Sequence, residues 1–309
     1  IGAMAIPEML KRGYDRKLVV GSVAAGGTLG ILIPPSIPMI LYGTITDESV
    51  GKLFMSGVMP GALLTLAFVA YIVIASWNKP REERASHEAK MKSLRENIWG
   101  LLLPVIIIGG IYTGIFTPTE GGAFAAIYAI LVCVLYYREL SFRDLLRVSA
   151  RAARTTSVVM LIVATATAVG WFITIAQIPN QMTALFSPLI DSPILLLISI
   201  NIFLFLIGMV MDLTPNILIF APVFYPLIQQ AGIDPYYFGL LFVLNLGIGV
   251  ITPPVGTVLY VVCGIGHIKF ADLIVKLIPF VFVETLMLFL LLFFPKLSLV
   301  PMNWLMGGN

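Results

Sequence analysis

Charged side chains are scarce in this sequence of 309 residues, since Asp, Glu, Lys and Arg together make up only 11%. A soluble domain carries about 25% charged residues, so a soluble globular fold is excluded. Apolar residues account for 59% of the chain, and they gather in long uncharged runs. Scarce charge and long apolar runs together predict an all-α polytopic membrane protein.

Cysteine is also rare, and three common catalytic motifs do not occur in the sequence. The two cysteines, Cys133 and Cys263, lie far apart in apolar segments, so the sequence predicts no disulfide framework. There is no HExxH, GxSxG or P-loop motif, so the sequence offers no machinery for hydrolysing ATP and no sign of an enzyme. No nucleic-acid partner is expected.

Among the features that are present, the uncharged run from Leu18 to Thr46 is the most informative. It is longer than the roughly 20 residues of a straight membrane span. Gly30, Pro34 and Pro35 lie in its middle, and proline removes a helical hydrogen bond. Unpaired backbone is tolerated at membrane depth only where it lines a cavity or binds something. We therefore predict an interrupted helix with a binding site at the break.

This run has a counterpart near the C-terminus. The offset of 219 residues that separates Gly30 from Gly249 also pairs Pro34 and Pro35 with Pro253 and Pro254. The same offset matches further positions without a gap: Pro7 with Pro226, Gly13 with Gly232, and Asp15 with Asp234. Chance similarity between two Gly/Pro-rich apolar segments is the alternative. Paired interrupted segments point to the binding site of a secondary transporter.

The hydropathy pattern divides the chain into a series of elements. We expect a helix end and a first broken helix within 1–45, a span at 53–77, a charged loop at 78–96, two spans within 97–137, an amphipathic interfacial helix at 141–154, a span at 155–178, a hairpin at 193–230, a second broken helix at 236–265 and a last span at 271–294.

The distribution of basic residues orients these elements. If the crossings alternate, all but Lys52 and Lys296 of the 19 Lys and Arg residues fall on one side, which the positive-inside rule makes the cytoplasm. The two broken helices then cross in opposite senses, so the repeats are inverted. The same offset predicts that the natural subunit has about 120 further N-terminal residues, including the tip of a first hairpin.

Asp212 is the most informative single residue, because no Lys or Arg occurs between 155 and 268 to pair with it. A carboxylate at membrane depth is expensive and usually faces a wet cavity, an ion or a partner. In the alternative interpretation, 193–210 and 216–230 are two full spans, and Asp212 caps a helix in an ordinary loop. We favour the hairpin, with Asp212 at its turn.

Polar residues near the breaks supply oxygen ligands for a hard cation such as sodium, while half-helix N-termini offer amides to an anion. The candidates for substrate binding are Asp212, Thr214, Asn216 and Asn245. Thr252 lies at the second break. Glu120 either caps a helix or has a functional role, and Glu284 is either a buried, hydrogen-bonded residue or a contact to another subunit.

Several motifs resemble one family. They are Ile6-Pro7-Glu8-Met9, Arg12-Gly13-Tyr14-Asp15, the segment from Gly30 to Ser36, Gly57-Val58-Met59-Pro60-Gly61, the segment from Gly114 to Glu120, Gly232-Ile233-Asp234-Pro235, Asn245, and the segment from Gly249 to Gly256. Over its whole length the chain resembles the large membrane subunit of tripartite ATP-independent periplasmic (TRAP) transporters, and in overall similarity it is nearer to the sialic-acid branch.

The resemblance implies a sodium-driven elevator transporter in a bacterial inner membrane. Its mobile transport domain would contain both hairpins and both broken helices, with scaffold spans at 53–77, 97–137 and 271–294. The implied sodium ligands are Gly27, Thr28, Gly30 and Pro34 at one site, and Gly247, Gly249, Thr252 and the Asp212 turn at the other.

The implied partners are a small membrane subunit, a periplasmic substrate-binding protein, the lipid bilayer and an organic acid. We expect sialic acid as the substrate first and a C4-dicarboxylate second. A stand-alone sodium/dicarboxylate symporter is the alternative in the same class. From other classes, an ion channel would conduct without solute coupling, and a membrane enzyme would need a nucleophile and base that we do not find in the sequence.

Overall fold

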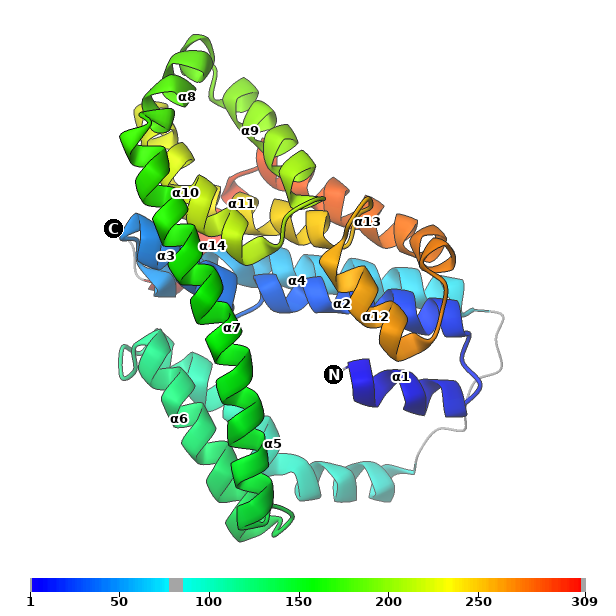
Figure 1. Cartoon of the computed structure of the whole chain (residues 1–309). Coiled ribbons are helices and arrows are strands. Elements are labelled where there is room, and N and C mark those ends of the chain that lie inside the picture. Colours follow the sequence, from blue (N-terminus) through cyan, green and yellow to red (C-terminus); the bar gives the residue numbers. More distant parts are fainter. Residues whose placement is uncertain (1, 78–85, 307–309) are drawn as a thin grey trace. The chain divides into compact units, whose positions relative to one another are not determined.

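The computed structural model describes residues 2–77 and 86–306 (Figure 1). All regular secondary structure in this part of the chain is helical, and six helical segments are long and apolar enough to cross a membrane. The prediction of an all-α polytopic membrane protein is confirmed. Contacts divide the chain into two units, Ile1–Ile74 with Ile162–Asn309 and, separately, Ala75–Leu161, and each is described by itself.

The first uncharged run forms two helices, α2 (Arg16–Leu32) and α3 (Ile37–Thr46). Between them Ile33 is extended, with φ −86° and ψ 130°, because a residue before proline avoids the helical region. Ser36 then starts α3 as its N-cap, accepting a hydrogen bond from the Met39 amide at 3.4 Å. The interruption predicted at the glycine and proline residues is confirmed.

The second run is interrupted at the corresponding place. Helix α11 (Pro235–Val250) ends before the two prolines, and α12 (Thr257–Gly266) begins after them. Gly256 precedes α12 with a φ of 55°, a left-handed conformation that glycine adopts without steric cost. The Pro34–Pro35 and Pro253–Pro254 peptide bonds are both cis.

The two interrupted paths run antiparallel. A Cβ atom built on Gly266, at the end of α12, would lie 2.5 Å from Cγ2 of Val20, near the start of α2. At the other end, the Tyr42 hydroxyl of α3 donates to the Pro235 carbonyl at the start of α11, at 3.2 Å. The end of each path therefore meets the beginning of the other.

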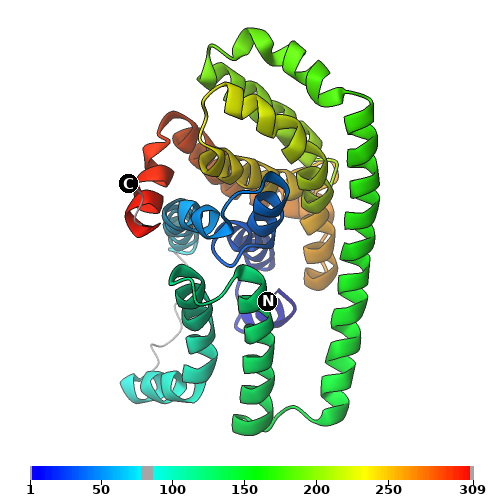
Figure 2. The ribbon, with the colours of Figure 1, turned by 90° about the vertical axis from the view of Figure 1, so that its left-hand side faces the viewer.

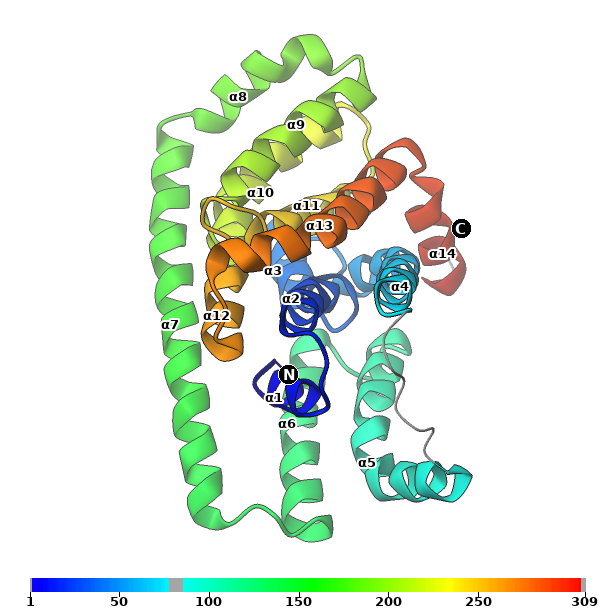
Figure 3. The same cartoon turned by 90° about the vertical axis from the view of Figure 1, so that its right-hand side faces the viewer.

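Helix α11 is the centre of the larger unit. Every residue from Tyr237 to Val250 is buried, as expected of a helix that is apolar on all sides. Around it pack α2, α3, α9 (Pro193–Gly208), α10 (Leu213–Gln230) and α13 (Phe270–Phe293), several of which are visible in Figure 3. The second break therefore directly follows a helix that is buried on all sides.

Helices α9 and α10 form the predicted hairpin, and they contain 16 and 18 residues. Both fall short of the roughly 20 residues that cross a bilayer without tilt. Residues 209–212 form the turn between them. These lengths favour the hairpin over two complete spans.

Two spans assigned to the scaffold pack directly on the first interrupted path. In α4 (Val50–Ala75), a Cβ on Gly57 would lie 2.5 Å from the Leu32 carbonyl oxygen at the end of α2. Helix α13 packs along α2 and α11, and its Phe280 meets Phe68 of α4 edge to face, at 5.2 Å between ring centroids. The unit containing the broken helices therefore includes both spans.

The smaller unit contains α5 (His87–Tyr112), α6 (Pro118–Leu131) and a π-helical turn at Val132–Tyr136. Helix α5 bends along its length (Figures 2 and 3), and Pro104 cannot donate to the Gly100 carbonyl within it. Of the predicted loop at 78–96, residues 78–85 lie outside the described residues, whereas the chain from His87 onward is helical rather than looped.

Three segments differ from expectation. The amphipathic helix and the span predicted at 141–154 and 155–178 form one continuous helix, α7 (Phe142–Ile175), because no glycine or proline occurs before Gly170 to interrupt it. Between this helix and the hairpin, where no element is predicted, lies α8 (Ile178–Phe186). A further helix, α14 (Lys296–Met306), follows the last span and was not predicted.

Candidate functional site

The turn of the α9–α10 hairpin packs directly against the second break. A Cβ on Gly249 would lie 2.6 Å from the carbonyl carbon of Gly208, so only glycine permits this approach of two backbones. The Val255 amide donates to the Met209 carbonyl at 3.2 Å. Two of the predicted features, the hairpin turn and the second break, therefore form one site.

Asp212 lies at this junction and is exposed. Its Oδ1 accepts a hydrogen bond from the Thr257 hydroxyl at 3.1 Å, at the start of α12. Although Asp212 occupies the N-cap position of α10, its side chain makes no capping hydrogen bond. The carboxylate therefore joins the hairpin to a half-helix instead of capping its own helix.

The other polar residues of the turn are partly enclosed. Thr214 is half-buried, and Asn216 is fully buried with its Nδ2 donating to the Met211 carbonyl at 3.1 Å. The Asn216 Oδ1 atom has no hydrogen-bond partner among the described residues. An unpaired buried amide oxygen is costly, so Asn216 offers an acceptor to a donor or cation that enters the turn.

Thr252 lies within the second break, where proline changes the pattern of backbone hydrogen bonds. Its hydroxyl donates to the Ile248 carbonyl at 2.6 Å, and its amide donates to the Gly249 carbonyl at 2.9 Å. Pro254 has no N–H, so the carbonyl of Val250 loses its helical donor. Carbonyl oxygens of this kind are suitable ligands for a hard cation. Gly247 and Gly249 are buried in the last turn of α11.

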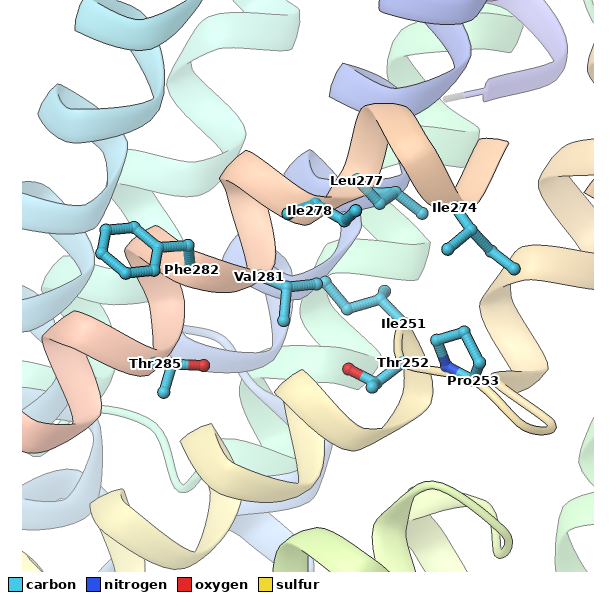
Figure 4. A pocket seen from close by; sticks show the side chains of 9 residues that line it. All are labelled: Ile251, Thr252, Pro253, Ile274, Leu277, Ile278, Val281, Phe282 and Thr285. Atoms are coloured by element: carbon cyan, nitrogen blue, oxygen red, sulfur yellow. The ribbon is translucent and has the colours of Figure 1, made fainter. Parts of the chain in front are cut away.

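A pocket of about 310 Å³ adjoins this break (Figure 4). Ile251, Thr252 and Pro253 line one side, and residues of α13 from Ile274 to Thr285 line the other. Apart from the two threonines, the lining side chains are apolar. This pocket alone supplies too few polar groups to hold an organic anion.

Asn245 is placed elsewhere by the structure. Its Nδ2 donates to the carbonyl and to Oδ1 of Asn201 in α9, both at 2.8 Å. Both residues line a second, apolar pocket of about 250 Å³ between α9, α11 and α13. Asn245 therefore joins α11 to the first arm of the hairpin, and within residues 2–77 and 86–306 its side chain makes no hydrogen bond to the Asp212 turn.

The residues predicted for the first sodium site are divided between two faces of α2. Gly27 and Gly30 are exposed, and a Cβ built on either would have no described residue outside the neighbouring backbone of α2 within 4 Å. Thr28 is buried on the side that faces α13, and Pro34 is buried at the break. Pro34 leaves the Gly30 carbonyl without its helical donor, whereas the Ile31 carbonyl accepts from the Ser36 hydroxyl.

Glu284 of α13 is a buried carboxylate in the larger unit. It is fully buried, and its Oε1 accepts a hydrogen bond from the Thr28 hydroxyl. Of the two interpretations left open for it, the buried, hydrogen-bonded one is confirmed. The available signal was a single carboxylate in the otherwise uncharged stretch between Lys276 and Lys296.

Glu120 lies in the smaller unit, at the start of α6, where it completes a capping box. Its Oε2 accepts from the Thr117 amide at 2.8 Å, while the Thr117 hydroxyl oxygen accepts from the Glu120 amide at 3.3 Å. The side chain is exposed. The capping interpretation of Glu120 accounts for these contacts.

Comparison with known proteins places this arrangement in a family. The family model described as "Tripartite ATP-independent periplasmic transporter, DctM component" matches residues 1–297. The chain belongs to this family. It is accordingly a multi-pass membrane permease of a bacterial TRAP system and not an enzyme.

Named relatives align along almost the whole chain. The 2,3-diketo-L-gulonate TRAP transporter large permease protein YiaN of Escherichia coli is 44% identical over 99% of this chain and 72% of its own length. The C4-dicarboxylate TRAP transporter large permease protein DctM of Pseudomonas aeruginosa is 39% identical, with the same two coverages of 99% and 72%. The sialic acid TRAP transporter large permease protein SiaM of Vibrio cholerae is 34% identical, again over 99% and 72%.

Proposed function

We propose that this TRAP permease subunit imports an organic acid together with sodium by an elevator mechanism. The observation that carries the proposal is the junction of the hairpin turn with the second break, where Gly208 meets Gly249 and Asp212 accepts from Thr257. It combines a carboxylate, freed carbonyl oxygens and half-helix ends, which suit a hard cation beside an anion.

In this proposal sodium is a co-transported substrate. The Thr252 hydroxyl, the carbonyls near the prolines and the Asp212 turn would hold one ion, and the Gly30 carbonyl near Pro34 would contribute to another. Sodium entering down its gradient would favour movement of the loaded carrier, provided that the half-loaded carrier moves poorly. The substrate would bind at the hairpin turn, near Thr214 and Asn216.

The mobile part of the elevator would contain the hairpin and both broken helices. The packing of α4 and α13 on α2 supports including these two spans in the mobile part as well, whereas the family resemblance implies that they belong to the scaffold. The two interrupted paths run antiparallel, and the end of each contacts the beginning of the other. This arrangement supports the inverted repeat that such a movement requires.

The substrate class is a small organic acid. Relatives named for sialic acid are 36% and 34% identical, below the 44% of the relative named for 2,3-diketo-L-gulonate, so overall identity does not single out sialic acid. In a tripartite system a periplasmic binding protein would deliver the acid, and a small membrane subunit would support the permease. The bilayer would be the bacterial inner membrane.

The test is uptake into liposomes containing the assembled transporter, with and without its binding protein. We expect uptake of 2,3-diketo-L-gulonate, a C4-dicarboxylate or sialic acid only when an inward sodium gradient and the binding protein are both present. Equal uptake in sodium and potassium would contradict sodium coupling. Full uptake without the binding protein would favour the stand-alone sodium/dicarboxylate symporter.

A further inference from the structure

The buried carboxyl group of Glu284 has no basic partner. No ion pair with Glu284 occurs among residues 2–77 and 86–306, and its side chain has no solvent exposure. Its Oε2 atom makes no hydrogen bond within the same described residues. A charged group buried in this way is unstable unless a positive charge or several donors compensate it.

The Glu284 carboxylate has one hydrogen-bond donor among the described residues, the Thr28 hydroxyl, and it shares this donor with a backbone carbonyl. The single hydroxyl hydrogen of Thr28 has two acceptors within reach, the Ala25 carbonyl oxygen at 2.6 Å and Glu284 Oε1. Oε2 of the same carboxylate has no donor. The Ala25 carbonyl also accepts the Leu29 amide within α2, so the unpaired oxygen is Oε2 of Glu284. When Glu284 is ionised, a cation beside Oε2 would balance its charge.

The ligand types at this position indicate the kind of cation. One carboxylate with a hydroxyl and a carbonyl oxygen is a hard, oxygen-only set that balances a single positive charge. No group of three or more His, Cys, Asp or Glu residues that could hold a metal ion occurs in the part of the chain that was described. A monovalent ion therefore fits better than a divalent one.

We propose that Glu284 and Thr28 together hold a sodium ion between α13 and α2, with Glu284 as its anionic ligand. This inference rests on the proposed sodium coupling and deepens it. The ion would lie on the side of α2 that faces α13, away from the exposed face with Gly27 and Gly30. Helix α2 ends at the first break. Binding of the ion would link the packing of α13 to the first interrupted path.

The experiment uses the assembled transporter with Glu284→Gln, which keeps the shape of the side chain and removes its charge. Two quantities are measured: sodium-dependent uptake in liposomes, and the rise in unfolding temperature of the purified complex when sodium replaces potassium. Ligands that bind only the folded state stabilise it, so the second quantity reports binding without transport. Thr28→Val approaches the same site from the other helix.

We expect Glu284→Gln and Thr28→Val each to raise the sodium concentration for half-maximal effect by roughly tenfold or more in both measurements. The double variant should be no worse than the more severe single variant, because both would remove the same ion. Glu48→Gln is the matched control. It neutralises a carboxylate that accepts from the Tyr225 hydroxyl at 2.6 Å, outside the proposed site, and should leave the sodium curve unchanged.

The outcomes separate the two proposals. If the unmodified transporter shows no sodium dependence, the proposed function fails. If it depends on sodium while Glu284→Gln and Thr28→Val keep its sodium curve and its stabilisation by sodium, this inference fails alone. A proton-driven uptake that Glu284→Gln abolishes, without any effect of sodium, would also overturn the sodium site.

Discussion

Among single residues, Asp212 is both exposed and linked to another element. Its carboxylate accepts from Thr257 and joins the hairpin turn to α12, yet the described residues provide no basic partner for it. An exposed side chain contributes little to folding, so its removal should affect function rather than stability.

Asp212→Asn should therefore reduce substrate uptake by roughly tenfold or more, because a charge that faces an ion or a wet cavity at this depth is functional. The variant should unfold at an unchanged temperature. Asp191→Asn, at another exposed aspartate, is the control and should transport normally. Normal uptake by Asp212→Asn would remove this carboxylate from the site.

Thr252 supports a narrower prediction, because its hydroxyl lies at the second break and donates to the Ile248 carbonyl. Thr252→Val should raise the sodium concentration for half-maximal uptake, while Thr252→Ser, which keeps the hydroxyl, should behave like the native protein. Sodium titration of uptake measures both. Identical curves for the valine and serine variants would argue against the second ion site.

Among elements, the contact between the hairpin turn and the second break depends on two glycines. Gly249→Ala should destabilise the protein by about 1–3 kcal/mol, since its Cβ would meet the Gly208 backbone and force the two segments apart. Gly247→Ala is the control, because its Cβ would lie 3.6 Å from the nearest atom, an ordinary contact. Thermal unfolding in detergent compares them, and equal stability would contradict the close approach.

The assignment of α13 to the mobile part can be tested by joining it to α2. A Cβ on Gly21 would lie 3.6 Å from that of Lys276, within the range of a disulfide. Cys133 and Cys263 are free and must first be replaced. Gly21→Cys with Lys276→Cys should cross-link and keep most uptake, because both helices would move together. Loss of uptake that a reductant restores would place α13 in the fixed scaffold.

At the scale of the whole molecule, basic residues determine orientation in the membrane. A cysteine introduced at Lys52 should react with a membrane-impermeant maleimide added to spheroplasts, whose inner membrane is intact. A cysteine introduced at Arg143 should react only after the inner membrane is permeabilised. Native cysteines are replaced for this experiment too. Labelling of both positions from outside would invalidate the predicted topology.

The sequence determined the features that depend on local chemistry. Scarce charge indicated a membrane protein, and two consecutive prolines indicated each break, because proline lacks an N–H and also turns the preceding residue away from the helical conformation. A single proline, such as Pro60 in α4, leaves its helix continuous. The matched offset also identified the two breaks as a pair. The continuous α7 and the helices α8 and α14 were predicted poorly, since hydropathy does not reveal where a helix ends without glycine or proline.

Helix packing, by contrast, establishes which side chains meet. It placed the hairpin turn on the second break, directed Asn245 toward Asn201, separated Thr28 from Gly27 and Gly30, and brought Glu284 to Thr28 from 256 residues away. Such meetings depend on how helices pack, and packing is fixed by the shapes of both surfaces at once. No local pattern in the sequence contains that information.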